Sequence, residues 1–384
     1  MEFPVYLDHA ATTPVAPEVL EAMQPYFSEI YGNPSSLYSL GQAAREAVET
    51  ARENVARVLC VSPEEIVFTS GGTESDNAAL RGAAEANRAK GRHLLTTPIE
   101  HSAVLEPLAS LARQGFEIES LPVDSEGVVD PQEVARRLRP DTTLVTVMAA
   151  NNEIGTVEPI GEIGALCRAR GVLFHTDAVQ AFGKLPLDAR ALQVDLLSLS
   201  AHKIYGPKGI GALYVRRGIA WTRFQEGGDQ EKGRRGGTLN VPGIVGLGKA
   251  AGIAAEAMES ESARLSALRD GFFARLEAEI PGTRIIGNRT QRLPNNIHFC
   301  VEGVEGEPML LALDAAGICA SAGSACSAGS TEPSHVLLAL GLTRELARGA
   351  LRLTLGRQTK AEALDYTLQT LAATVRDLRA LGAR

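Results

Sequence analysis

Short apolar segments alternate with amphipathic segments from about residue 65 to residue 217, and this alternation constrains the fold more than any other feature of the chain. Runs of four or five β-branched and apolar residues predict strands, and apolar residues at three- and four-residue spacing predict helices. Strands that alternate with helices build a parallel sheet covered on both faces. We therefore predict an α/β fold around a mostly parallel seven-stranded sheet flanked by helices.

The predicted strands are Ile66–Thr69, His93–Thr97, Ile118–Leu121, Leu144–Met148, Leu173–Asp177, Leu196–Ser200 and Gly211–Val215. The predicted helices between them are Thr73–Asn87, Ala103–Gln114, Pro131–Leu138 and Ile160–Arg170. After about Gly248 the pattern changes to a long helix, Lys249–Ile280, followed by pieces that are typical of a smaller α+β domain. We predict a large domain at residues 15–250 and a small domain at residues 1–14 and 251–384.

Composition narrows the class of protein. A chain of 384 residues with 45% hydrophobic and 22% charged residues is ordinary for a soluble two-domain enzyme. Its formal net charge of -8 gives no electrostatic reason to bind nucleic acid or an anionic membrane. Five scattered cysteines argue against a disulfide framework, and no apolar run is long enough to serve as a signal or a membrane span. We expect a cytoplasmic protein that binds neither nucleic acid nor membrane.

Two side chains at the ends of neighbouring predicted strands indicate a cofactor. Lys203 follows the strand Leu196–Ser200, and Asp177 ends the strand Leu173–Asp177. Ligands of open α/β sheets bind at the carboxyl ends of the strands. A lysine amine can hold the aldehyde of pyridoxal phosphate (PLP), and a carboxylate can keep its pyridine nitrogen protonated. We therefore predict PLP as the cofactor, with Lys203 as its Schiff-base lysine and Asp177 as its pyridinium partner.

The segment Thr69–Ser75, TSGGTES, offers a place for a phosphate where a strand turns into a helix. Glycines let the backbone come close, and the free N–H groups and the helix dipole favour an anion. A glycine pair before a helix is more often ordinary turn chemistry. Because Ser200 and His202 flank Lys203 and could donate to the same phosphate, the combination favours a phosphate site that includes Gly72 and Thr73.

Other polar residues have both a functional and a structural interpretation. His101 begins a helix after a strand, where histidine usually caps or faces solvent, but beside a PLP ring it could stack and exchange protons. Arg352 alternates with leucines in Leu351–Leu355 and could bind a substrate carboxylate, although the pattern alone more often marks a surface arginine. The loop amides Asn33 and Asn152 could share that task or shape turns. No histidine or cysteine spacing requires a metal.

Residues 321–330, SAGSACSAGS, place Cys326 in the middle of a loop of small residues. The loop could be a flexible connector with an incidental cysteine. A thiol surrounded by glycine and serine is expected to be exposed and nucleophilic. We therefore predict a mobile loop at about 321–332, whose Cys326 thiol attacks at the cofactor and then carries its product elsewhere. Cys319 could be a resolving thiol, although a core position on a strand is the simpler interpretation. The remaining cysteines are expected in the core: Cys60, Cys167 and Cys300.

With these residues in hand, the chain resembles the cysteine desulfurases, the fold-type-I PLP enzymes of nitrogen fixation and iron–sulfur cluster assembly in the class V aminotransferase superfamily. The resemblance extends over nearly the whole chain. Its most specific motifs, in the family's order, are Thr73–Asn77, Asn151–Gly155, His202–Gly209 and Gly323–Cys326. The sequence of the cysteine loop is similar to that of the first desulfurase group, whose loop is long and mobile.

The resemblance implies roles for the candidate residues. The family's pattern implies that Lys203 binds PLP, His101 stacks on its ring, Asp177 pairs with the pyridinium and Gln180 reaches the phenolic oxygen. The phosphate contacts implied are Gly72, Thr73, Ser200 and His202, with Thr238 supplied by the other subunit of a homodimer. The residues implied to hold the substrate carboxylate are Asn33, Asn152 and Arg352.

The implied activity is that of a sulfurtransferase. It removes sulfur from L-cysteine, gives L-alanine, and leaves a persulfide on Cys326 for a sulfur acceptor protein, such as an iron–sulfur scaffold or a tRNA-thiolation protein. Two alternatives stay open at this point. One is a PLP aminotransferase or selenocysteine lyase on the same fold, and the other is a relative that binds no cofactor and acts as a partner subunit.

Overall fold

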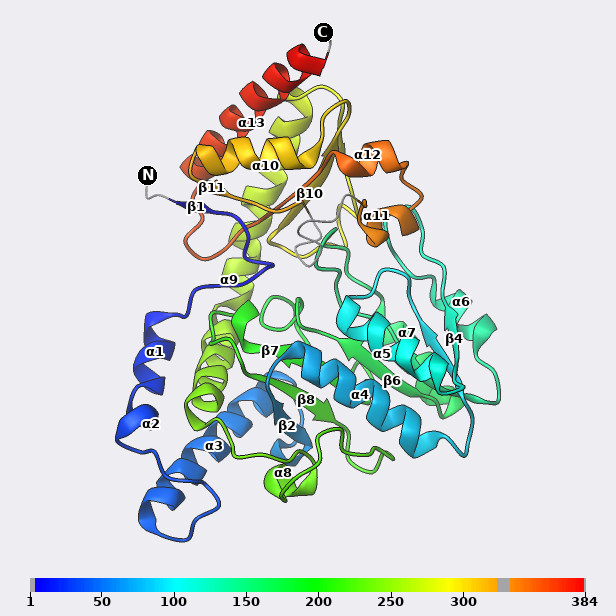
Figure 1. Ribbon diagram of the computed structural model, residues 1–384, viewed down its shortest axis with the longest axis vertical. Coiled ribbons are helices and arrows are strands. Elements are labelled where there is room, and N and C mark those ends of the chain that lie inside the picture. The colour runs from blue at the N-terminus through cyan, green and yellow to red at the C-terminus, as the bar shows by residue number, and fades with distance from the viewer. Residues whose placement is uncertain (1–3, 323–331, 383–384) are drawn as a thin grey trace.

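The computed structural model describes residues 4–322 and 332–382, and its larger part is built on a seven-stranded sheet (Figure 1). The strand order is β2-β8-β7-β6-β5-β3-β4. The strands are β2 (Ile66–Thr69), β3 (His93–Thr96), β4 (Glu117–Ser120), β5 (Thr142–Thr146), β6 (Leu173–Asp177), β7 (Leu196–Ser200) and β8 (Gly211–Val215). The five strands from β7 to β4 are parallel, and β8 is antiparallel to both of its neighbours. The predicted mostly parallel sheet is therefore confirmed.

Helices cover both faces of this sheet because successive side chains of its strands point to opposite sides. Val67 and Leu94 pack with α4 (Gly72–Asn87) and α5 (Ser102–Arg113) on one face. Phe68 and Leu95, one residue further along each strand, belong to the larger core on the other face. The helices of that second face are α3 (Ser39–Val58), α6 (Pro131–Arg137), α7 (Ile160–Arg170) and the first half of α9 (Val241–Glu279). Short elements of this part are α1 (Pro17–Met23), α2 (Pro25–Ser28), η1 (Pro63–Glu65), η2 (Ala201–Lys203) and α8 (Gln230–Gly233).

A second hydrophobic core lies around a smaller antiparallel sheet of order β12-β10-β9. Its strands are β9 (Thr283–Ile285), β10 (Asn296–Val301) and β12 (Ala350–Thr354), and β1 (Val5–Tyr6) pairs in parallel with β11 (Ile318–Cys319) nearby. The helices of this part are α10 (Gly306–Ala315), α11 (His335–Ala339), α12 (Arg344–Arg348) and α13 (Ala361–Gly382). Figure 1 shows α9 running from the larger part into this smaller one. The predicted domain boundary at residue 250 lies inside α9 and stays a prediction.

Two details differ from the sequence-based expectations. Helix α9 begins at Val241, eight residues before the predicted Lys249, because the side chain of Asn240 caps it by accepting from the backbone N–H of Gly243 at 3.1 Å. The prediction that Cys60 lies in the core is wrong, since it is exposed in the turn after α3 with a φ of 56°. Cys167 and Cys300 are buried as predicted, and Cys319 is half-buried. Among the helices of residues 4–322 and 332–382, none is long and apolar enough to cross a bilayer.

Candidate active site

A cavity of about 460 Å³ opens at the carboxyl ends of the parallel strands and extends to β12 of the smaller sheet. Its volume is in the usual range for small-molecule sites. Most of the predicted site residues line it, from both halves of the chain: Gly72, Thr73, His101, Asn152, Asp177, Gln180, Ser200, His202, Lys203 and Arg352. The fold therefore assembles one site from motifs that are up to 280 residues apart, the separation of Gly72 from Arg352 (352 − 72).

Lys203 and Asp177 occupy the positions that a PLP site requires. The Lys203 amine donates hydrogen bonds to the backbone oxygens of Ala10 and Ala11, each at 2.7 Å. Asp177 is buried at the end of β6, and its Oδ1 accepts from the backbone N–H of Val179 at 2.9 Å. Burial raises the pKa of Asp177, while His101 and Lys203 act in the opposite direction. A buried carboxyl of this kind is well matched to a cationic ring nitrogen.

The amino end of α4 forms the glycine-rich wall of the cavity. Gly71 precedes the helix with a φ of 154°, which side chains rarely adopt. A Cβ on Gly72 would lie only 2.7 Å from Cγ2 of Val179. The Val179 side chain therefore leaves no room for a side chain at position 72. The Nδ1 of His202 lies 3.1 Å from the Thr12 hydroxyl, and burial together with the charge on Lys203 lowers the pKa of His202 to about 4. A neutral His202 can donate one N–H to an anion.

His101 caps α5, and its ring is oriented by that role. Its Nδ1 accepts from the backbone N–H of Ala103 at 3.1 Å, so a neutral ring carries its proton on Nε2. The same residue lines the cavity. The structural interpretation of His101 as a cap and the functional one as a cavity residue are therefore compatible.

Arg352, on β12, lines the cavity from the smaller sheet and is only 1% exposed. Its guanidinium donates to Oδ1 of Asp8 at 2.9 Å and to the backbone oxygen of Asn152 at 3.0 Å. The interpretation of Arg352 as a surface arginine is therefore wrong, because the pairing of β12 with β10 puts its side chain inside the protein. The Gln180 amide, also at the cavity, donates to the backbone oxygen of Ala10 at 2.9 Å.

Two predicted residues lie away from this cavity. Asn33 is exposed in a turn, where its Oδ1 accepts from the backbone N–H of Ser35 at 2.9 Å. Thr238 is exposed in the segment before α9. The resemblance assigns Thr238 to the site of the other subunit of a homodimer, so a single chain leaves that prediction untested. The role of Asn33 also stays a prediction.

Cys326 lies outside the described residues, but both ends of its segment are fixed at the cavity. On one side, Ser321 and Arg352 exchange backbone hydrogen bonds of 3.1 and 2.7 Å. On the other side, His335 lines the cavity, and its Nε2 lies 3.0 Å from the backbone oxygen of Glu100. The chain therefore leaves and re-enters the described structure beside the candidate site.

Sequence reasoning did not identify three buried carboxyls that also line the cavity, Asp76, Glu100 and Glu153. Burial raises the pKa of Glu100 to about 8, and its Oε1 accepts from the Thr97 hydroxyl and the backbone N–H of Met148, both at 2.9 Å. Burial, followed by the nearby Asp177, raises the pKa of Asp76 well above its ordinary value. An acidic residue on the sheet-facing side of α4 was the signal that could have revealed Asp76.

These residues fit PLP. They supply an amine, a buried carboxyl, a glycine-lined helix end with hydroxyl and imidazole donors, and a buried guanidinium on the smaller sheet for a substrate carboxylate. The fit rests on the chemistry of the residues that line one cavity.

Comparison with known proteins agrees with this geometry. Residues 5–367 match the family Aminotransferase class-V, which consists of PLP-dependent enzymes. The chain is 50% identical over 381 residues to the cysteine desulfurase IscS of Dictyoglomus turgidum, which covers 99% of this chain and 97% of that protein. It is 51% identical over 375 residues to the cysteine desulfurase IscS of Methanosarcina thermophila, covering 98% and 93%.

Solved structures give the same result. A NifS-like protein superposes with a TM-score of 0.92 at 40% identity and covers 97% of this chain and 100% of its own. A protein described as SspA in complex with cysteine superposes with a TM-score of 0.81 at 39% identity, covering 91% and 98%. The family predicted from the motifs is confirmed. The chain belongs to the class-V aminotransferase family and, within it, to the cysteine desulfurases.

Proposed function

We propose that this enzyme uses PLP to move the sulfur of L-cysteine onto Cys326 and to release L-alanine. The observation that carries the proposal is the single cavity lined by Lys203, Asp177 and Arg352, with both ends of the segment that holds Cys326 at its edge. This arrangement supports the proposal that the Lys203 amine, the PLP ring and the Cys326 thiol act together on one small amino acid.

The residues of the larger sheet would hold the cofactor. Lys203 would bind its aldehyde carbon, Asp177 its ring nitrogen, His101 its ring face and Gln180 its phenolic oxygen. The phosphate contacts would be Gly72, Thr73, Ser200, His202 and, from the second subunit of a homodimer, Thr238. When bound, PLP supplies a ring that accepts electrons from the substrate.

The substrate would be oriented from the smaller sheet. The Arg352 guanidinium, fixed by Asp8 and by the backbone of Asn152, would bind the α-carboxylate of L-cysteine. The side-chain amide of Asn152, which lines the cavity, would assist, and the same role for Asn33, which lies outside this cavity, rests on the family resemblance alone. A carboxylate held at β12 directs the rest of so small a substrate toward Lys203, and this is the positioning that makes a proton transfer efficient.

Proton transfer is assigned to Lys203 and His101. The Lys203 amine would take the proton from the α-carbon, and His101 and Lys203 would return protons to the product. The Cys326 thiolate would attack the substrate sulfur, so that an S–S bond forms as the C–S bond breaks. L-Cysteine and the thiol become L-alanine and a persulfide, and no external oxidant or reductant is consumed.

The persulfide on Cys326 would then pass its outer sulfur to an acceptor protein in the cytoplasm, such as an iron–sulfur scaffold or a tRNA-thiolation protein. The test is mass spectrometry of the PLP-loaded enzyme after brief exposure to L-cysteine without reductant. We expect one additional sulfur atom on the peptide that contains Cys326. Additional sulfur on Cys319 alone would contradict the assignment.

A further inference from the structure

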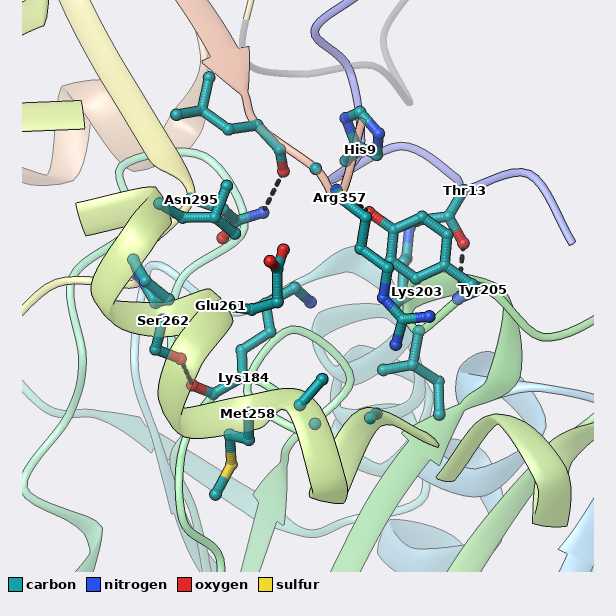
Figure 2. A pocket seen from close by; sticks show the side chains of 18 residues that line it. His9, Thr13, Lys184, Lys203, Tyr205, Met258, Glu261, Ser262, Asn295 and Arg357 are labelled. Atoms are coloured by element: carbon teal, nitrogen blue, oxygen red, sulfur yellow. Dashed lines mark hydrogen bonds between the residues drawn. The ribbon is translucent and has the colours of Figure 1, made fainter. Parts of the chain in front are cut away.

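A second, smaller cavity of about 50 Å³ also reaches Lys203 (Figure 2). Of all the residues that line either cavity, Lys203 is the one they share. The polar side chains around the smaller cavity are His9, Thr13, Lys184, Tyr205, Glu261, Ser262, Asn295 and Arg357. The space is large enough for at least one ordered water, and the walls offer it several polar partners. We call it the rear cavity.

Lys184 is the second lysine of the rear cavity, and its amine is held in place. The Nζ donates to the backbone oxygen of Gln180 at 2.9 Å, and the backbone oxygen of Lys184 accepts from the Ser262 hydroxyl at 2.9 Å (Figure 2 shows the second bond). Within the part of the chain that the structure describes, no carboxylate forms an ion pair with this amine. Desolvation, together with the charge on Lys203, lowers the pKa of Lys184 to about 7.

The other charged groups of the rear cavity leave the two amines as its main proton-binding sites. Burial lowers the pKa of His9 to about 4 and raises the pKa of Tyr205, so both are neutral near pH 7. The Glu261 carboxylate is bound by Arg264 at 2.9 Å. The Arg357 guanidinium lies over the Tyr205 ring, 4.5 Å from its centroid.

On the substrate side, the titratable groups that line the cavity with Lys203 are Asp76, Glu100, His101, Glu153, Asp177, His202 and His335, and the Arg352 guanidinium lines it as well. Burial, followed by the charge on Lys203, lowers the pKa of His202, and His101 and Lys203 oppose the rise that burial gives to the pKa of Asp177. The Asp177 carboxyl belongs to the cofactor nitrogen in the proposed function. The rear cavity therefore brings a second amine, that of Lys184, to the Lys203 side chain, and protonation of one amine disfavours protonation of the other.

A short chain of hydrogen bonds connects the two amines. Lys184 binds the backbone of Gln180, the Gln180 amide binds the backbone oxygen of Ala10, and Lys203 binds that same oxygen. These bonds have lengths of 2.9, 2.9 and 2.7 Å. The positions of Lys184 and Lys203 are therefore set by one shared network rather than by two independent loops.

We propose that Lys184 is a positioning residue for Lys203, acting across the rear cavity to weaken proton binding by the Lys203 amine. Two amines in a poorly solvated region bind a first proton more readily than a second, and a neighbouring cation is one of the ways in which enzymes activate a lysine. Lys203 must accept a proton from the substrate and later give one up, and both steps need an amine whose proton is not held tightly. This inference rests on the proposed function of Lys203.

The test uses the apo-protein and needs no turnover. The rate at which Lys203 takes up PLP is followed by visible absorbance across a pH series, with Lys203→Ala as the background. The variants are Lys184→Met, which removes the charge, Lys184→Arg, which keeps it, and Ser262→Ala, which removes an uncharged contact of the same cavity. We expect the midpoint of the pH profile to rise by about one unit in Lys184→Met, about a tenfold change in proton affinity.

In Lys184→Arg the midpoint is expected to stay at or below the parental value, and in Ser262→Ala it is expected not to move. The unfolding temperature shows whether Lys184→Met is folded like the parent. If it is, and if the midpoint of its pH profile for PLP uptake equals that of the parent, the proposal is overturned. If Lys184→Met does not fold, a higher midpoint in Lys184→Arg overturns it instead. Uptake of PLP with full visible absorbance by Lys203→Ala would refute the function proposed for Lys203, and that result is distinct from either outcome for Lys184.

Discussion

The Arg352 guanidinium donates a 2.9 Å hydrogen bond to Oδ1 of Asp8, although the two residues are 344 positions apart. Asp8 lies just after β1, and a backbone bridge joins it to Thr354 of β12. The beginning of the chain therefore fixes the arginine near its end. A guanidinium that is oriented before the substrate arrives loses little freedom on binding a carboxylate.

We expect Arg352→Lys to raise the KM for L-cysteine and to lower kcat/KM by about 10- to 100-fold, because lysine keeps the charge but loses the paired donors. Steady-state kinetics with L-cysteine measures this change. Arg284→Lys, at an exposed arginine on β9 of the same sheet, is the matched control and should behave like the parent. An unchanged KM in Arg352→Lys would remove Arg352 from the substrate site.

Cys326→Ser is expected to bind PLP and to change its visible spectrum on addition of L-cysteine, yet to acquire no protein-bound sulfur, because serine is a poor nucleophile toward sulfur. Cys319→Ser is the control. Burial, together with the charges of Asp314 and Asp8, raises the pKa of the Cys319 thiol, so it is a weak nucleophile. If Cys319→Ser lost sulfur transfer and Cys326→Ser kept it, the nucleophile would be Cys319 and not Cys326.

Gly72→Ala should weaken the retention of PLP by at least about tenfold, since its methyl group would lie 2.7 Å from Val179 and displace the helix end that receives the phosphate. Dialysis against buffer, followed by measurement of the cofactor that remains, gives the result. Gly252→Ala is the matched substitution, because that position in α9 has open space around it and should gain up to about 1 kcal/mol of helix stability. Equal retention by both variants would exclude a phosphate at Gly72.

Glu158 provides a test of stability against pH. Burial raises its pKa from 4.5 to about 8, so the folded protein holds a proton that the unfolded chain loses between these values. Its contribution to stability therefore falls as the pH rises from about 4.5 to 8. Glu158→Gln should remove this loss. The difference in the free energy of unfolding between the variant and the parent should therefore be larger at pH 8 than at pH 5, by on the order of a few kcal/mol in favour of the variant.

Urea unfolding of Glu158→Gln at pH 5 and pH 8 measures the effect. Glu18→Gln, at an exposed glutamate of α1, is the control and should change stability equally little at both values. A stability difference for Glu158→Gln that is the same at pH 5 and pH 8 would show that Glu158 is ionised in the folded protein.

The sequence was most informative where local pattern and tertiary structure agree. Ile160–Arg170 and Leu196–Ser200 have the predicted bounds because their apolar periodicity coincides with their burial. The start of α9 was missed because the glycine-rich run from Val241 to Gly248 has low helix propensity and is stabilised by tertiary packing, with Gly248 against Ala51 of α3. Cys60 was wrongly placed in the core because it follows an apolar segment. That segment ends in a turn, which exposes the Cys60 side chain.

The candidate site was predictable where its residues follow strands. Lys203 and Asp177 stand at strand ends, so topology alone brings them to one edge. Burial of Arg352 depends on a strand pairing that no local pattern indicates. Asp8 and Glu100 were missed for the same reason, since each reaches the site only through contacts with distant segments.

The most direct test of the central claim is to give the purified, PLP-loaded enzyme L-cysteine with a thiol reductant and to measure alanine and sulfide together. The proposed function predicts equal amounts of the two products, and it predicts that both are lost in Cys326→Ala. Pyruvate in place of alanine, or sustained formation of alanine by Cys326→Ala, would contradict the transfer of sulfur to Cys326.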